Sequence, residues 1–193
     1  ALSQIRAQSS LKDLQERVGR LLFRIPPPAV LSPDGEHVAY AAPRGSKWAL
    51  VIDGQVGPEI DIGATTPVFS PDGRHLAYAT QNGKKWVVVL DGKPGPPFPD
   101  IQVSSLVFSA NGMRFAYVAD KGNKEVAVID GQVGSDFDLI VGPAFSADSA
   151  HVAYTALTHK SERQVAVVDG RIGPEVTVQV PASILLDKSS RIV

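Results

Sequence analysis

The sequence predicts an all-β protein made of repeated units, and three observations support this prediction. First, nearly the same stretch occurs four times, with anchors 38, 39 and 37 residues apart: Leu31, Phe69, Phe108 and Phe145. Second, each copy contains a Pro-Asp-Gly turn or a variant of it, in which proline presets φ and glycine supplies a positive φ. Third, each copy closes an apolar run on Asp-Gly, a strong hairpin signal. A period of about 40 residues with four short strands per unit is typical of a β-propeller blade.

We therefore predict a β-propeller of four-stranded blades over residues 26–193. In each copy, strand a is the run that ends at Phe-Ser or Leu-Ser, and strand b carries Ala-Tyr. Strand c is of the type of residues 86–90, and strand d is of the type of residues 59–62. Strand c is apolar on both faces in the first two copies, as a sheet packed between two other sheets requires. Four copies are complete and a fifth is partial; they begin near residues 30, 68, 107, 144 and 184.

Residues 1–25 differ from the repeats and predict a short amphipathic helix followed by a lead-in strand. Ser10 suits the N-cap of the helix, and Asp13 suits its first turn. Residues 20–25 resemble a strand that stops at three prolines. The helix carries one apolar stripe, formed by Leu11, Leu14, Val18 and Leu21. We expect this stripe to pack on its own domain, and the alternative is a docking helix for a partner.

Composition narrows the classes of function. With 193 residues, the chain is long enough for one domain with its own core. Its net charge of -1 predicts no bulk attraction to nucleic acid or to an anionic membrane. No apolar run reaches the roughly 18 residues of a transmembrane helix. The absence of cysteine excludes disulfides, thiolate zinc sites and a cysteine nucleophile. Because the sequence starts at Ala1 rather than at methionine, we expect a trimmed chain whose targeting segment is out of view.

The polar residues that recur in the copies are explained by the blade rather than by catalysis. The aspartates of the Asp-Gly pairs are interpreted as turn formers: Asp53, Asp91, Asp130 and Asp169. Calcium ligation is the alternative, but the Asp-x-Asp-x-Asp-Gly spacing of a calcium loop is absent. One basic position is shared by His37, His75, Arg114, His151 and Arg191. Because arginine is rarely a metal ligand, this exchange favours a basic residue beside the turn aspartate over a metal site. The sequence has neither Gly-x-Ser-x-Gly nor a glycine-rich phosphate loop, so we expect no enzyme, no catalytic residue, no cofactor and no metal.

Two further features suggest binding surfaces. The loops between strands b and c are basic and supply candidate partner-binding residues: Arg44, Lys47, Lys84, Lys85, Lys121, Lys124, His159, Lys160 and Arg163. Solvated surface charge is one explanation, and a binding face for an acidic partner or ligand is the alternative. At the start of strand c stand Trp48 and Trp86. We expect both rings to fill space between blades, and the alternative is stacking on a sugar or a peptide.

The repeated motif also resembles a known family. Ser-Pro-Asp-Gly, then a basic residue, then an apolar residue with Ala-Tyr, is similar to the TolB-like, WD-repeat-like propellers. Residues 68–78 match this motif closely and residues 30–40 nearly as well. Asn111 in place of aspartate and Ser149 in place of glycine depart from it, and they predict looser turns in the third and fourth copies. The resemblance covers most of the chain and implies a binding scaffold in a periplasmic or otherwise extracytoplasmic bacterial location. The same repeats also occur in propellers attached to serine hydrolase domains of the prolyl-oligopeptidase type.

The expected function is therefore a non-catalytic β-propeller scaffold that mediates protein–protein interactions as a subunit of a larger extracytoplasmic assembly. Two alternatives stay open: the propeller portion of a larger prolyl-oligopeptidase-like hydrolase, and a carbohydrate- or peptide-binding propeller. The partial fifth copy leaves an incomplete blade with an open sheet edge, which proteins usually protect. Either the chain continues beyond Val193, or a partner covers this blade. We thus expect other protein subunits as partners, and neither nucleic acid nor a membrane span.

Overall fold

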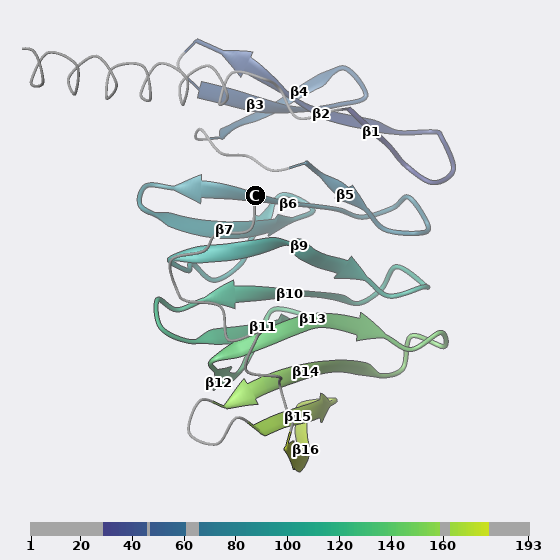
Figure 1. Cartoon of the computed structure of the whole chain (residues 1–193). Helices are drawn as coiled ribbons and strands as arrows, with labels where there is room; N and C mark the ends of the chain where they lie inside the picture. Colours follow the sequence, from purple (N-terminus) through teal and green to yellow (C-terminus); the bar gives the residue numbers. More distant parts are fainter. Residues whose placement is uncertain (1–28, 46, 61–65, 159–162, 178–193) are drawn as a thin grey trace, which may run out of the picture.

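The computed structural model describes residues 29–45, 47–60, 66–158 and 163–177. Within these residues, sixteen β-strands form four antiparallel sheets of four strands each (Figure 1). The prediction of an all-β fold is therefore confirmed. The predicted lead-in strand and N-terminal helix lie outside the described residues, as does the apolar stripe of that helix: Leu11, Leu14, Val18 and Leu21.

Each sheet is one blade, and its strands follow the order of the chain. Blade 1 contains β1 (Val30–Leu31), β2 (Val38–Arg44), β3 (Lys47–Ile52) and β4 (Gln55–Ile60). Blade 2 contains β5 (Val68–Phe69), β6 (Leu76–Asn82), β7 (Lys85–Leu90) and β8 (Lys93–Pro94). Blade 3 contains β9 (Asp100–Phe108), β10 (Phe115–Asp120), β11 (Glu125–Ile129) and β12 (Gln132–Phe137). Blade 4 contains β13 (Leu139–Phe145), β14 (Val152–Thr158), β15 (Arg163–Val168) and β16 (Arg171–Thr177).

The Asp-Gly pairs form the tight hairpins between strands c and d. In blade 1, Asp53 and Gly54 have φ angles of 50° and 77°. Positive φ at both central residues defines a two-residue type I′ turn, which suits the twist of the flanking strands. Ile52 therefore pairs directly with Gln55. The prediction that strand d lies at residues 59–62 is wrong at its start, because this turn lets pairing resume at once.

The turns between strands a and b touch from one blade to the next. A Cβ added at Gly73 would lie 2.6 Å from Oδ2 of Asp34 in the preceding blade, so this position has no room for a larger residue. The a–b turn of blade 4 makes a different contact with the turn before it. Here the backbone N–H of Asn111 in blade 3 donates to Oγ of Ser149 at 3.0 Å. The backbone N–H of Ser149 still donates to the Ser146 carbonyl at 2.8 Å, as in the glycine turns. The prediction of looser turns in the third and fourth copies is therefore wrong.

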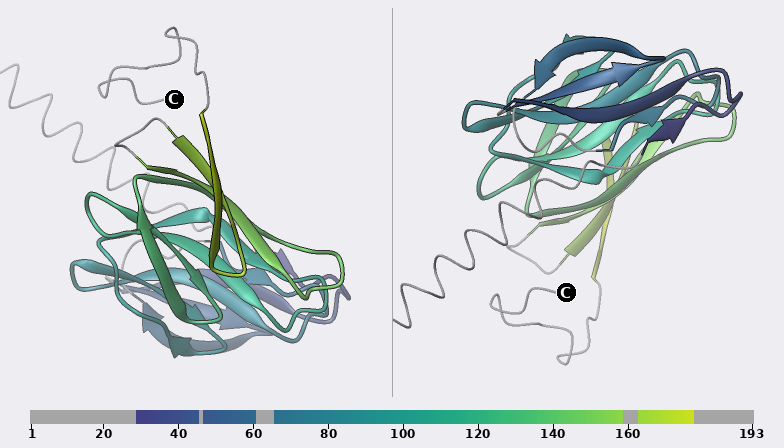
Figure 2. Two further views of the ribbon diagram at one scale, coloured as in Figure 1. Left: turned by 90° about the horizontal axis from the view of Figure 1, so that it is seen from below. Right: turned by 90° about the horizontal axis from the view of Figure 1, so that it is seen from above.

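The hydrophobic core lies between blades rather than inside any one of them. Three buried clusters join successive blades, with members that include Leu50 and Tyr78, Val88 and Tyr117, and Ala127 and Tyr154. Each of blades 2 to 4 thus presents the face that bears its tyrosine to the preceding blade. The sheets are stacked in chain order, and the strands of blade 4 are rotated relative to those of blade 1 (Figure 2).

Candidate functional site

In every blade an ion pair ties the basic position to the aspartate of the c–d hairpin. Nδ1 of the histidine lies 2.8 Å from the aspartate Oδ2 in blade 1, 2.7 Å in blade 2 and 2.6 Å in blade 4. In blade 3, Nε of Arg114 donates to Asp130 at 3.0 Å. The other carboxylate oxygen accepts a backbone N–H, as Oδ1 of Asp53 does from Val38 at 2.8 Å. The expectation of a basic residue beside the turn aspartate is confirmed.

In blade 1 these contacts shift the pKa values of both partners. The backbone N–H of Val38, together with His37, holds the pKa of Asp53 below its ordinary value. The hydrogen bond to Asp53 in turn raises the pKa of His37. Both partners are stabilised in their charged forms, so these groups are structural ion pairs of the turns. Their recurrence in each blade agrees with a role in the fold.

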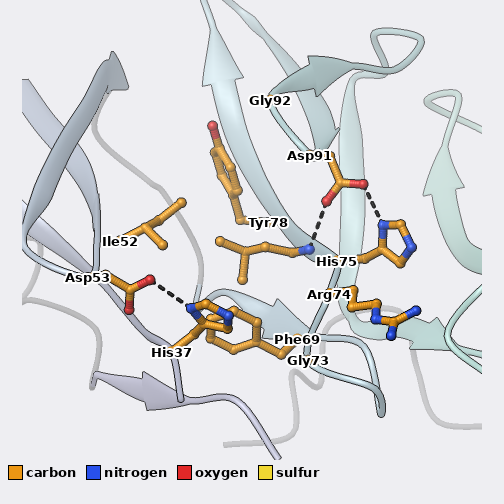
Figure 3. A pocket seen from close by; sticks show the side chains of 11 residues that line it. His37, Ile52, Asp53, Phe69, Gly73, Arg74, His75, Tyr78, Asp91 and Gly92 are labelled. Atoms are coloured by element: carbon orange, nitrogen blue, oxygen red, sulfur yellow. Dashed lines mark hydrogen bonds and ion pairs between the residues drawn. The ribbon is translucent and has the colours of Figure 1, made fainter. Parts of the chain in front are cut away.

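A pocket of about 270 Å³ lies on the turn side of the junction between blades 1 and 2 (Figure 3). Its apolar lining includes Ile52 of blade 1 and Phe69 and Tyr78 of blade 2. Its polar lining includes both ion pairs of these blades, from His37 to Asp53 and from His75 to Asp91. The pocket therefore combines an aromatic surface with carboxylates and imidazoles. Sequence reasoning missed it, because only the stacking of the blades brings these residues together.

A second feature is an uncovered sheet face on blade 4, called here the blade-4 outer face. On blades 1 to 3, the alanine before the tyrosine of strand b is 0% exposed: Ala39, Ala77 and Ala116. The equivalent Ala153 of blade 4 is exposed, and Val141 on the same face is 60% exposed. On β13, β14 and β15, the strand register places nine uncharged residues on this face: Leu139, Val141, Ala144, Ala153, Thr155, Leu157, Gln164, Ala166 and Val168. Arg171 of β16 pairs with Val168 and puts one charge at the edge of this face. It is a face of the kind that other blades bury, without a following blade among the described residues.

The predicted basic loops are largely neutralised by nearby carboxylates. Lys121 contacts Asp136 at 2.7 Å, and Lys124 contacts Asp138 at 2.8 Å. Glu59 receives both basic residues of the first loop, Arg44 at 3.9 Å and Lys47 at 3.6 Å. Arg163 pairs with Glu175. Among the described residues only Lys84 and Lys85 of the predicted set have no acidic partner, and His159 and Lys160 lie outside them. The loops between strands b and c therefore carry mostly paired charges and do not form one continuous basic surface.

The tryptophans and one tyrosine are part of the core. Trp48 is 8% exposed, and Trp86 is half-buried against the cluster between blades 2 and 3. Both rings fill space between blades, as expected, which leaves little free surface for stacking on a sugar. Burial also raises the pKa of Tyr117 to about 12. Its hydroxyl has no hydrogen-bond partner among the described residues.

The described part of the chain lacks two kinds of feature. It contains no group of three or more His, Cys, Asp or Glu residues able to hold a metal ion. It also contains no helix long and apolar enough to cross a membrane.

Comparison with known proteins identifies the fold. No family model and no curated protein matches the sequence. Among solved structures, the β-propeller domain of the Trilobed protease from Pyrococcus furiosus matches with a TM-score of 0.51 and 18% identity. The match covers 80% of this chain and 56% of that chain. The fold is a β-propeller. Its neighbour is described as having an open velcro topology.

Two more propeller-containing structures match over a similar part of this chain. TolB from Acinetobacter baumannii has a TM-score of 0.42 and 18% identity, over 77% of this chain and 42% of that chain. The acylaminoacyl peptidase of Pyrococcus horikoshii has a TM-score of 0.44 and 15% identity, over 79% of this chain and 32% of that chain. This chain thus spans 32% to 56% of the length of the three structures. Identities this low speak for the fold alone.

Proposed function

We propose that this chain is a non-catalytic β-propeller scaffold that mediates protein–protein interactions as a subunit of a larger extracytoplasmic assembly. The blade-4 outer face carries the proposal. Of its nine residues on β13, β14 and β15, six are exposed and three are half-buried, and none of the nine is charged. Contiguous exposed apolar surface of this kind marks interaction sites in soluble proteins.

The occupant of this face is a β-sheet of a partner protein. The three blade junctions show which side chains pack against an uncharged outer face of a blade. At the first junction, Leu50 of blade 1 packs in one cluster with Leu76, Tyr78 and Val89 of blade 2. A partner sheet that presents large apolar side chains around a tyrosine would continue this stacking. The resemblance of the repeat motif to TolB-like propellers supports the extracytoplasmic location.

A pair of single-cysteine variants tests this docking. The sequence has no cysteine, so one thiol reports on one position. Ala166→Cys places a thiol at the centre of the blade-4 outer face, and Met113→Cys is the matched control at a turn residue that is 79% exposed. In the isolated chain, both thiols react rapidly with a maleimide. In the assembly purified from the source cells, we expect the A166C thiol to react at least about tenfold more slowly and the M113C thiol to react as before.

Equal labelling of the A166C thiol in the assembly would exclude this face as the contact. So would a native particle mass of 20.5 kDa, that of the chain alone.

The propeller portion of a larger hydrolase is the second candidate. The observation in its favour is that the matched propeller with the TM-score of 0.51 belongs to a protease. The intact mass of the natural polypeptide separates the two candidates. A mass near 20.5 kDa favours the scaffold, and a mass large enough for further blades and a hydrolase domain favours the second candidate.

A further inference from the structure

Arg114 fills the turn side of the junction between blades 3 and 4. Its Nε donates to Asp130 in its own blade at 3.0 Å. Its Nη1 donates to the carbonyl oxygen of Ala150 in blade 4 at 2.8 Å. Its Cζ lies 5.2 Å from the ring centroid of Phe145, also in blade 4. A carboxylate, a carbonyl and an aromatic face are three kinds of partner that suit a guanidinium.

The junction between blades 1 and 2 has the equivalent partners but no guanidinium. His37 stands at the position of Arg114, and its Nδ1 contacts Asp53, as Nε of Arg114 contacts Asp130. The histidine side chain is shorter than the arginine side chain, and it lacks the guanidinium group with which Arg114 reaches the next blade. Phe69 takes the position of Phe145 in the repeat. The space that remains is the pocket of about 270 Å³ (Figure 3).

The carbonyl acceptor is also retained at this junction. Arg74 occupies the repeat position of Ala150. The turns that precede the two residues share their backbone hydrogen bonds, with N–H to carbonyl distances of 2.9 Å from Gly73 to Ser70 and 2.8 Å from Ser149 to Ser146. The Arg74 carbonyl thus corresponds in the repeat to the Ala150 carbonyl and follows a turn with the same hydrogen bond. Arg74 lines the pocket, and its side chain points away from His37 in Figure 3.

The pocket offers carboxylate acceptors in a lining of mixed charge. Two carboxylates, Asp53 and Asp91, belong to the lining together with their histidine partners and Arg74, and the carboxylate of Asp34 lies against Gly73 at the same turn. The hydrogen bond to Asp53 raises the pKa of His37. Above that raised value the ring is neutral, and a proton on Nδ1 directed at Asp53 then leaves Nε2 as a hydrogen-bond acceptor. A ligand with several N–H donors thus finds acceptors on more than one side, above the ring of Phe69.

We propose that the pocket between blades 1 and 2 binds the guanidinium of an arginine side chain on a peptide. This ligand takes in trans the place that Arg114 takes in cis between blades 3 and 4. The inference stands on the pocket and on Arg114, and it does not depend on the blade-4 outer face.

A titration of the full chain with N-acetyl-arginine methylamide, followed by the backbone amide NMR signals of residues 69–75, tests the proposal. His37→Arg should supply the missing guanidinium in cis and weaken binding of the probe at least about tenfold. Arg114 shows that the fold accommodates arginine at this position of the repeat. His151→Arg is the matched control, since it makes the same change in blade 4, and it should leave the affinity within about twofold of the wild type. The citrulline analogue, which has the same shape without the charge, should bind about fivefold more weakly.

Three results would overturn the proposal: no saturable shift in the wild type, equal affinity in H37R, or equal affinity of the citrulline analogue. Phe69→Leu gives a second measurement that needs no new charge. It keeps an apolar residue but removes the ring, and it should weaken the arginine probe about fivefold. Unchanged affinity in F69L would show that the ring is not part of the site.

Discussion

Blades 3 and 4 have the same kind of face on the side away from the preceding blade. Among the described residues, only the face of blade 3 is buried by another blade. Val118 and Ala127 pair across strands b and c of blade 3 and are 1% and 0% exposed. The equivalent pair of blade 4, Thr155 and Ala166, is half-buried and exposed, respectively. All four side chains are small and uncharged. The difference therefore lies in the neighbouring sheet, and it shows that burial in a blade stack is a property of the junction.

A charge at these two equivalent positions should have very different effects on stability. Ala127→Glu would place a carboxylate between blades 3 and 4 with no solvent, and we expect it to lower the free energy of unfolding by about 4 kcal/mol. Ala166→Glu changes an exposed position and should lower it by less than about 1 kcal/mol. Urea denaturation of the two variants beside the wild type measures the difference. Equal losses would mean that the blade-4 outer face is covered in the isolated chain.

The turn contacts of the two blades offer a smaller contrast. Gly112→Ala puts a Cβ at a φ of 77°, 2.5 Å from Oδ1 of Asp72, and should destabilise the protein by about 2 kcal/mol. Ser149→Ala keeps the positive φ of 63° and removes the acceptor of the Asn111 N–H, for a loss of about 1 kcal/mol. Ser149→Gly also removes the acceptor but relieves the backbone strain, so its net effect should be near zero. A larger loss in S149G than in S149A, seen in urea midpoints, would contradict this account.

The blade architecture could be predicted from the sequence because its signals are local. Asp53 and Gly54 adopt the positive φ angles that an Asp-Gly hairpin requires, and each copy repeats such a pair. The turn of blade 4 shows where local reasoning fails. Ser149 looked like a poor substitute for glycine, but its hydroxyl accepts a hydrogen bond from Asn111 in another blade. Only the contact between successive turns reveals that the two departures from the motif are complementary.

The candidate sites could be predicted much less well. The pocket lies where blades 1 and 2 are stacked, and the sequence does not say that a side chain at the repeat position of His37 can reach the next blade, as Arg114 does. The basic loops were visible as a pattern, but the carboxylates that pair with them, such as Asp136 with Lys121, come from strand d and its neighbourhood. Spacing within a repeat predicts which residues are equivalent. It does not predict which of the equivalent residues contact a side chain from another strand or blade.

The pH dependence of stability should separate the turn of blade 4 from that of blade 3. The hydrogen bond to Asp169 raises the pKa of His151 above 6.5, and Asp148 acts in the same direction while Arg114 acts against it. A raised pKa in the folded state means that this stabilisation is fully present below about pH 6.5 and is lost as the pH rises through the folded value. The contact with His151 likewise lowers the pKa of Asp169 below 3.8, so the contribution of this carboxylate is lost only as the pH falls toward that lower value.

His151→Gln should therefore destabilise the protein more at pH 5.5 than at pH 8.5. Arg114→Gln is the comparison, because the guanidinium is charged at both pH values. Since Arg114 lowers the pKa of His151, its loss relieves a repulsion only while His151 is charged, and the R114Q penalty should be slightly smaller at pH 5.5 than at pH 8.5. Urea midpoints of both variants and of the wild type at the two pH values give the four differences needed. If the H151Q penalty does not shrink at pH 8.5, the histidine pair acts as a neutral hydrogen bond rather than an ion pair. Arg114 also contacts Ala150 and Phe145 of blade 4, so the sizes of the two penalties are not compared directly. Their opposite dependence on pH reports whether the charge at this position of the repeat can be lost.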